Sequence, residues 1–142
     1  MSVTIPTGTY LIKNANDGSY MTVANTGGAG IAVTLDYGTN TSGEIWNVTP
    51  TANGGYTIQN YGNGYFLTPS GAGVTTEDAN HTWLIPTNSQ IVYTFSIQDA
   101  SSVANGLGMD SQTTGTPVLY EALSNNDNRQ CWYFLAKEPV GA

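Results

Sequence analysis

The chain has 142 residues, of which only 9% are charged, and its net charge is -7. Lys13, Arg129 and Lys137 are its only strong cations. They are too few to neutralise a row of phosphates, so nucleic acid and anionic membranes are poor partners. The single cysteine, Cys131, excludes an internal disulfide framework and is expected to be a small buried hydrophobe.

Residues 1–8 contain neither a basic segment nor an apolar one, so no secretory signal is visible. The sequence therefore predicts a cytoplasmic protein, or one released by a non-classical route. No stretch approaches the ~20 apolar residues of a transmembrane helix, so membrane insertion is not expected.

A five-residue phrase with large apolar residues at its first and third positions occurs three times, at Tyr10–Asn14, Tyr56–Asn60 and Phe95–Asp99. Each copy is followed by one Trp, and these are the only Trp residues of the chain: Trp46, Trp83 and Trp132. Repetition at this spacing indicates an architecture of repeated units. We expect one domain made of three units, at approximately 1–51, 52–88 and 89–142.

The apolar residues of each phrase alternate, which places them on one face of an extended segment. The first unit shows four strands most clearly, at Gly8–Asn14, Ser19–Val23, Ile31–Asp36 and Glu44–Thr49. Four strands in each unit predict an all-β fold of twelve short strands. A closed barrel or β-trefoil suits them, because closure removes exposed strand edges.

The third unit closes with Gln130-Cys-Trp132, and the other two close with similar segments before Trp46 and Trp83. This QxW-type pattern, with a Gly-x-Tyr-like opening strand, resembles the ricin B-like β-trefoil lectins, particularly the small fungal ones. The resemblance covers essentially the whole chain. It implies a β-trefoil of three pseudo-repeats, no metal or cofactor, and a defensive role through galactose- or N-acetylgalactosamine-type glycans and glycoproteins. Mushroom β-trefoil protease inhibitors share the frame, so fold and function are separate questions.

In a ricin B-like sugar site an Asp ends the second strand, an aromatic residue lies on the third, and an Asn and the Gln of QxW follow. The third unit matches this pattern with Asp110, Tyr120 and Gln130. Arg129 occupies the position of the Asn, so either Asn128 serves after a small loop shift or Arg129 itself donates to a sugar oxygen. A ring stacks on the apolar face of a pyranose, while a carboxylate accepts from adjacent hydroxyls.

A structural role is the alternative for each of these residues. Asp110 would cap a turn with Ser111, Tyr120 would belong to the barrel wall, and Gln130 would support loop backbone. The three Trp residues are expected in the core.

The other two units match the pattern less well. Aligning Gly106–Asp110 with Gly18–Thr22 and Gly64–Thr68 places Thr at the acid position. The first unit has Asp36 at the aromatic position, so a weak site there would use Asp36, Tyr37 and Asn40. The shorter second unit is expected to be structural.

Catalysis is not expected, because no recognisable catalytic motif occurs and neither His81 nor Cys131 has an evident partner. His81 is interpreted as an occupant of a QxW-like position rather than a metal ligand. A protease inhibitor is the rival hypothesis, acting through the loop from Ala122 to Arg129. Arg129 would enter the acidic pocket of a trypsin-like protease, whereas Asn125 and Asn126 at the loop tip would suit a legumain-like protease. For a lectin of modest monovalent affinity, a homodimer would raise avidity.

Overall fold

The computed structural model describes residues 4–23, 29–37, 41–109, 117–124 and 127–138. Within them the strands and 3-10 helices are β1 Gly8–Asn14, β2 Tyr20–Thr22, β3 Ile31–Ala32, β4 Thr34–Asp36, η1 Ser42–Glu44, β5 Trp46–Pro50, β6 Tyr56–Asn60, β7 Phe66–Ser70, β8 Gly73–Glu77, β9 Trp83–Leu84, β10 Thr87–Asn88, β11 Thr94–Phe95, β12 Gln98–Asp99, β13 Asn105–Met109, β14 Val118–Ala122, η2 Asn128–Gln130 and β15 Trp132–Ala136. No helix in these ranges is long and apolar enough to cross a membrane.

The predicted all-β trefoil is confirmed, and its twelve strands appear as fifteen segments because three of them are interrupted. The third strand of the first unit is divided into β3 and β4 at Val33. Two further breaks separate β9 from β10 and β11 from β12. Pro86 lies in the first of these breaks and has no N–H to donate to a ladder. The predicted strand at Glu44–Thr49 begins later, at Trp46, because Glu44 belongs to η1.

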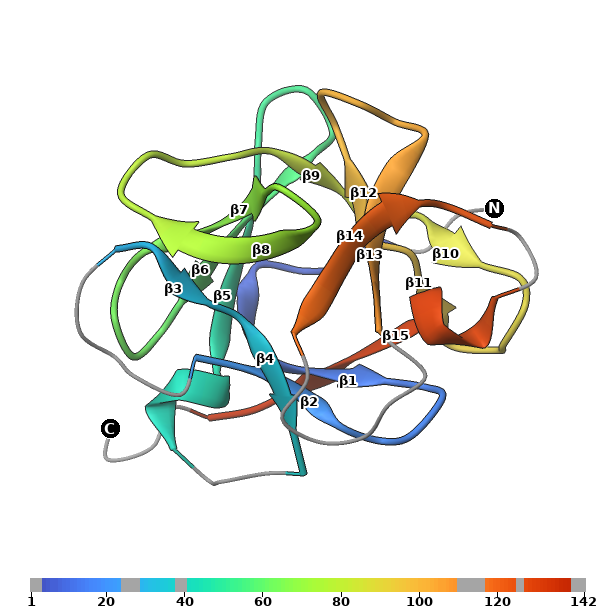
Figure 1. Ribbon diagram of the computed structural model, residues 1–142, viewed down its shortest axis with the longest axis horizontal. Helices are drawn as coiled ribbons and strands as arrows, with labels where there is room; N and C mark the ends of the chain where they lie inside the picture. Colours follow the sequence, from blue (N-terminus) through green and yellow to red (C-terminus); the bar gives the residue numbers. More distant parts are fainter. Residues whose placement is uncertain (1–3, 24–28, 38–40, 110–116, 125–126, 139–142) are drawn as a thin grey trace.

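Six strands form a closed ring, counting β9 with β10 and β11 with β12 as one strand each. The ring runs through the pairs β1–β5, β5–β6, β6–β9, β9–β12, β11–β15 and β15–β1. The hairpins β2–β4, β7–β8 and β13–β14 surround one centre (Figure 1). They are joined through the pairings β3–β8 and β8–β14 and through a bridge from Thr34 to Pro117.

The three Trp side chains are fully buried in a single apolar core, as predicted. Each indole N–H donates to a carbonyl on the second strand of its own unit: Trp46 to Met21 at 3.1 Å, Trp83 to Leu67 at 2.9 Å, and Trp132 to Leu107 at 3.1 Å. Cys131 is also buried, as expected, and burial raises the pKa of its thiol. Because each indole N–H has a hydrogen-bond acceptor, the three rings are held in one orientation in the core.

The last residue of the repeated phrase joins neighbouring units. Asn14 Nδ2 donates to the carbonyl of Arg129 at 2.8 Å, and Asn60 Nδ2 donates to the carbonyl of Gly43 at 2.9 Å. Both Asn side chains are fully buried. The loop before each of these QxW-type strands is therefore held by the unit that follows it in the ring.

Candidate functional site

The carbonyls bound by the three indoles mark equivalent residues in the three units, namely Met21, Leu67 and Leu107. The expected correspondence of Met109 with Met21 is therefore wrong by two residues, because Leu107 makes that contact. Gly108, rather than Asp110, corresponds to Thr22. Asp110 itself lies outside the described residues.

A row of three outward positions crosses each unit, and its central position is the residue just before this indole contact. The register pairs one residue from the first strand, one from the second and one from the third: Lys13–Tyr20–Asp36, Gln59–Phe66–Glu77 and Gln98–Gly106–Glu121. We call these the first, second and third outer rows. Their neighbours along the second strands, Met21, Leu67 and Leu107, are buried. Alternation along a strand therefore turns the rows away from the core.

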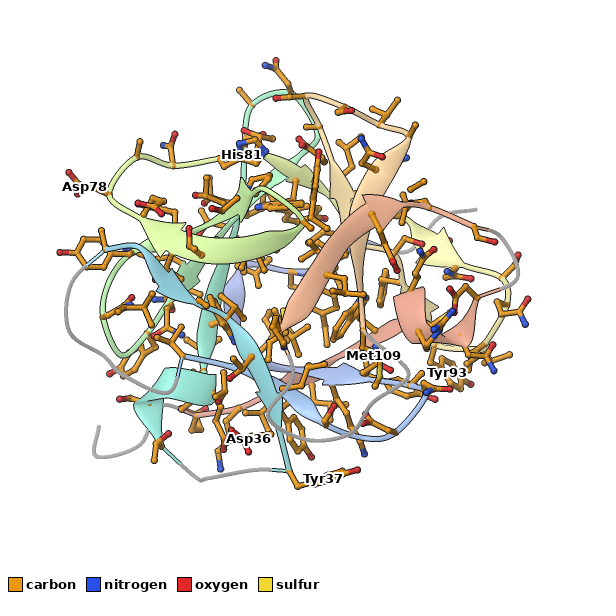
Figure 2. The ribbon with its side chains drawn as sticks, in the orientation of Figure 1. Asp36, Tyr37, Asp78, His81, Tyr93 and Met109 are labelled. Atoms are coloured by element: carbon orange, nitrogen blue, oxygen red, sulfur yellow. The ribbon has the colours of Figure 1, made fainter. Side chains whose placement is uncertain are left out.

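The first outer row places an aromatic ring directly across from a carboxylate. Tyr20 on β2 pairs with Asp36 on β4, and both side chains are half-buried. Lys13 Nζ lies 5.9 Å from the centre of the Tyr20 ring on the opposite side of the row. Figure 2 shows Asp36 at the edge of the molecule, beside the exposed Tyr37. Asn40, the third residue predicted for this site, lies outside the described residues.

The second outer row repeats this arrangement with Phe66 across from Glu77. Both side chains are again half-buried. Thr75 Oγ1 donates to Glu77 Oε2 at 2.5 Å, and Gln59 Nε2 donates to the carbonyl of Gly64 at 2.9 Å. These bonds orient the carboxylate and the amide on either side of the ring. The second unit, interpreted from sequence as structural, therefore presents the same pair of chemical groups as the first.

The third outer row has no ring, because its central residue is Gly106. A Cβ at Gly106 would come within 2.3 Å of the Ile97 carbonyl oxygen, so a side chain does not fit. Glu121 lies opposite and accepts from Gln130 Nε2 at 2.9 Å. Gln130 also donates to the Ala122 carbonyl and accepts from the Ser124 amide. The Gln of QxW thus supports the backbone that follows β14.

Tyr120 lies on the face of β14 opposite to that of Glu121. It pairs with the buried Leu107, and its hydroxyl donates to Asp99 Oδ2 at 2.5 Å. His81 Nε2 is 2.8 Å from the other oxygen of the same carboxylate. Asp99 occupies the position of Asn14 and Asn60 but has no N–H to donate. It accepts hydrogen bonds at the junction of the second and third units instead.

The remaining residues predicted for the third unit lie along η2. Arg129 Nε and Nη2 donate to the two carboxylate oxygens of Asp127 at 3.0 and 3.1 Å. These bonds lower the pKa of Asp127 below its usual value, although burial opposes them. Asn128 Oδ1 accepts from Gln90 at 3.1 Å. Asn125 and Asn126, proposed for an inhibitory loop, lie outside the described residues.

The structure thus keeps Arg129, Asn128 and Gln130 together on η2 but directs Tyr120 towards Asp99. Sequence reasoning missed Tyr20, Phe66 and Glu77. A signal for the two aromatic residues was present in the sequence, because in both units an aromatic residue stands two positions after a turn glycine and is followed by an apolar residue and Thr.

The family model for ricin-type β-trefoil lectin domain-like proteins matches residues 2–83, which is more than half of the chain. The chain belongs to this family. The matched segment of this ricin-type trefoil contains the first and second outer rows. No curated protein matches the chain in a comparison of sequences.

Several solved structures share the fold of this ricin-type trefoil. The agglutinin of Rhizoctonia solani superposes with a TM-score of 0.82 at 20% identity, covering 95% of this chain and 99% of that one. The ricin B-like lectin of Macrolepiota procera, solved with lactose, gives 0.82 at 17% identity, with 95% and 100% coverage. The Polyporus squamosus lectin, bound to Neu5Acα2-6Galβ1-4GlcNAc, gives 0.72 at 19% identity, with 93% and 50% coverage. At these identities the similarity shows the shared fold.

Proposed function

We propose that this protein is a non-catalytic carbohydrate-binding protein that recognises galactose- or N-acetylgalactosamine-type glycans. Family membership supports the class of ligand, as do neighbours solved with lactose and with a galactose-containing saccharide. The observation that carries the proposal is the aromatic–carboxylate pair in two outer rows, Tyr20 with Asp36 and Phe66 with Glu77.

The chemistry of each pair fits a hexose. An aromatic ring offers its face to the C–H groups of a pyranose, and the neighbouring carboxylate accepts from two adjacent hydroxyls. Residues directly opposite in an antiparallel pair have Cβ atoms about 4.5–5.5 Å apart, so one sugar ring can contact both groups. Lys13 and Gln59 add N–H donors on the far side of each ring. The same sugar is thus offered a stacking surface, an acceptor and a donor.

A third site, in the third unit, forms part of the proposal and uses Asp110, Tyr120, Asn128, Arg129 and Gln130. The charged Arg129 and the exposed Asn128 support it, since both are polar groups at the surface beside QxW. In the first unit Tyr37 and Asn40 would extend the contacts of Asp36.

Two similar rows on one chain would also raise the avidity of the protein for glycan-coated surfaces. Shallow sugar sites are individually weak, and linking two of them raises the apparent affinity for a surface that carries many glycans. A homodimer would add further copies, so we propose it as the form that binds cell-surface glycoproteins most tightly.

A glycan array read with and without free lactose tests the function. Binding to terminal galactose or N-acetylgalactosamine that lactose competes away is the expected result. Calorimetry with a galactosyl oligosaccharide then tests the rows. Tyr20→Ala and Phe66→Ala should each weaken binding at one of the two rows, with affinity there falling about tenfold or more, in line with ~1.4 kcal/mol per decade.

Tyr61→Ala is the matched control, because it removes an aromatic side chain that is 38% exposed and lies outside the rows. It should bind like the wild type. A blank array would reject the proposed function. A positive array with full binding by both row variants would reject the rows and leave the third unit as the site.

A further inference from the structure

A cavity of about 400 Å³ lies at the junction of the second and third units. Its walls come from the strand that ends the second unit, from the first strand and turn of the third, and from the segment after β14. The lining residues include Pro86, Ser96, Gln98, Ala104, Leu123 and Ser124. Its volume falls within the range of small-molecule sites, roughly 300–1,000 Å³. None of the lining residues belongs to the first or second outer row.

Interrupted pairing marks the position of this cavity. Both strands of the junction are interrupted there, and a single backbone bond, from the Ser96 amide to the Pro86 carbonyl at 2.9 Å, lies between the breaks. Gln98 follows the second break and is paired with Gly106. The space beside Gly106 is filled by the Ile97 carbonyl and by Leu123, so the Gln98 side chain lines the cavity next to Leu123.

The polar groups of the cavity are held in fixed roles. Asn88 Nδ2 donates to Ser96 Oγ at 3.0 Å, so the Ser96 hydroxyl accepts there and keeps its own hydrogen for donation. Gln98 Nε2 donates to the Val103 carbonyl at 2.5 Å, which leaves Gln98 Oε1 as an acceptor. Ser96 and Gln98 are two residues apart along one extended segment and therefore share a face. The cavity offers a donor and an acceptor side by side.

The lining also determines the charge of a suitable ligand. None of its side chains is ionisable, and the chain as a whole carries a net charge of -7. Anions are disfavoured by this field, and a cation would find no carboxylate in the wall. Pro86, Val103 and Leu123 provide small apolar surfaces beside the polar pair. A neutral ligand with hydroxyls, an amide and a methyl group matches this set.

We propose that this cavity binds a neutral saccharide residue carrying an acetamido group, as a saccharide site separate from the first and second outer rows. The amide of the ligand pairs with Ser96 and Gln98, and its methyl group packs on Leu123 and Val103. The inference rests on the proposed function in taking a saccharide as the ligand, but it uses different residues.

Titration of ¹⁵N-labelled protein with free N-acetylgalactosamine at millimolar concentrations tests the site. The expected result is a saturating shift of the backbone amides of Ser96, Gln98, Ala104, Leu123 and Ser124, with galactose giving a response about tenfold weaker at the same amides. Ala104→Phe fills the cavity from an exposed position and should weaken the response about tenfold or more. Ala79→Phe, also at an exposed alanine but away from the cavity, should leave it unchanged. Ser96→Ala is a smaller second variant that removes only the donor and should also weaken the response.

Absence of shifts at these amides would overturn the proposal, as would equal shifts in the wild type, Ala104→Phe and Ser96→Ala. The outer rows are judged separately. Shifts confined to the amides around Tyr20 and Phe66 would support the rows and reject the cavity. Shifts at the cavity that persist in Tyr20→Ala and Phe66→Ala would support the cavity whatever the outcome for the rows.

Discussion

Tyr120 Oη lies 2.5 Å from Asp99 Oδ2 and donates to it within the third unit, while His81 of the second unit contacts the other oxygen of the same carboxylate at 2.8 Å. Burial raises the pKa of the Asp99 carboxyl, but hydrogen bonds from Tyr120, the Ser101 amide and His81 outweigh this and bring the pKa below its usual value. The hydrogen bond to Asp99, together with burial, raises the pKa of the Tyr120 hydroxyl. The junction therefore stabilises the ionised form of Asp99.

The free energy of unfolding should depend on pH through Asp99. A carboxyl whose pKa is lower in the folded state contributes its full stabilisation above the unfolded value, about 3.9 for Asp, and loses it as the pH falls through the folded value. Asp99→Asn cannot titrate. Between about pH 4 and pH 2 its unfolding free energy should vary less with pH than that of the wild type. Urea unfolding across this range measures both, and parallel curves would show that Asp99 does not contribute to acid sensitivity.

Asn60→Ala should destabilise the fold by about 2–3 kcal/mol, because it leaves buried backbone groups without partners. Asn60 Nδ2 binds the Gly43 carbonyl, and its Oδ1 accepts from the Gly62 amide. Gln59→Ala is the matched control, since the adjacent Gln59 makes a solvent-exposed bond and should cost less than about 1 kcal/mol. Thermal and urea unfolding measure both variants. If Asn60→Ala lost as little stability as Gln59→Ala, the junction bond would add little to the free energy of unfolding.

Gln130→Ala should reduce stability by about 2 kcal/mol, because the Ser124 amide and the Ala122 carbonyl lose their partner. Binding of glycan by the first and second outer rows should be unchanged. Arg129→Ala serves for comparison, since it alters the same 3-10 helix at a more exposed side chain. Arg129→Ala should be close to the wild type in stability. If it nevertheless lowers the affinity for glycan, the third-unit site binds sugar.

The protein should not inhibit trypsin. A residue that enters the primary pocket of a protease must extend away from its own loop, whereas Asp127 binds the Arg129 guanidinium through two hydrogen bonds. A chromogenic trypsin assay with excess protein tests this. Inhibition that disappears in Arg129→Ala and grows stronger in Asp127→Ala would instead establish the inhibitor function.

The repeated phrase and the three Trp residues were sufficient to predict an all-β body of three units, because both report on burial, whereas the choice of a β-trefoil rested on the resemblance of the QxW-type pattern to ricin B-like lectins. Alternating apolar residues indicate a half-buried strand. A Trp that recurs once in each unit of a chain with few charges is expected in the core. The breaks at Pro86 and at Ser96–Ile97 were not predicted, since the alternating pattern continues through them. Only the pairing of particular residues shows where a ladder stops.

The internal alignment of the third unit failed for a conformational reason. It matched Gly106 with Gly18 and Gly64, which have φ values of +79° and +77° and lie in turns. Gly106 lies inside β13, opposite Glu121, at a point where backbone and side-chain atoms leave no room for a Cβ. Glycine therefore has two different structural roles at the aligned positions, in a turn in the first two units and inside a strand in the third. The turn between the first and second strands is one residue longer in the third unit than in the other two. The indole contacts that reveal the shift are not visible in the sequence.

Among the strands in the described part of the chain, the first is paired with the last. Register couples β1 to β15 over five residues, from Tyr10 with Ala136 to Asn14 with Trp132. During synthesis β1 therefore emerges long before β15, with which it pairs. The β1 edge that pairs with β15 remains unpaired while the intervening chain is made. Folding of this trefoil should be a late, concerted event with many contacts between distant residues, and so a slow one compared with that of a helical protein of similar size. A nascent chain stalled before Trp132 should remain dependent on chaperones.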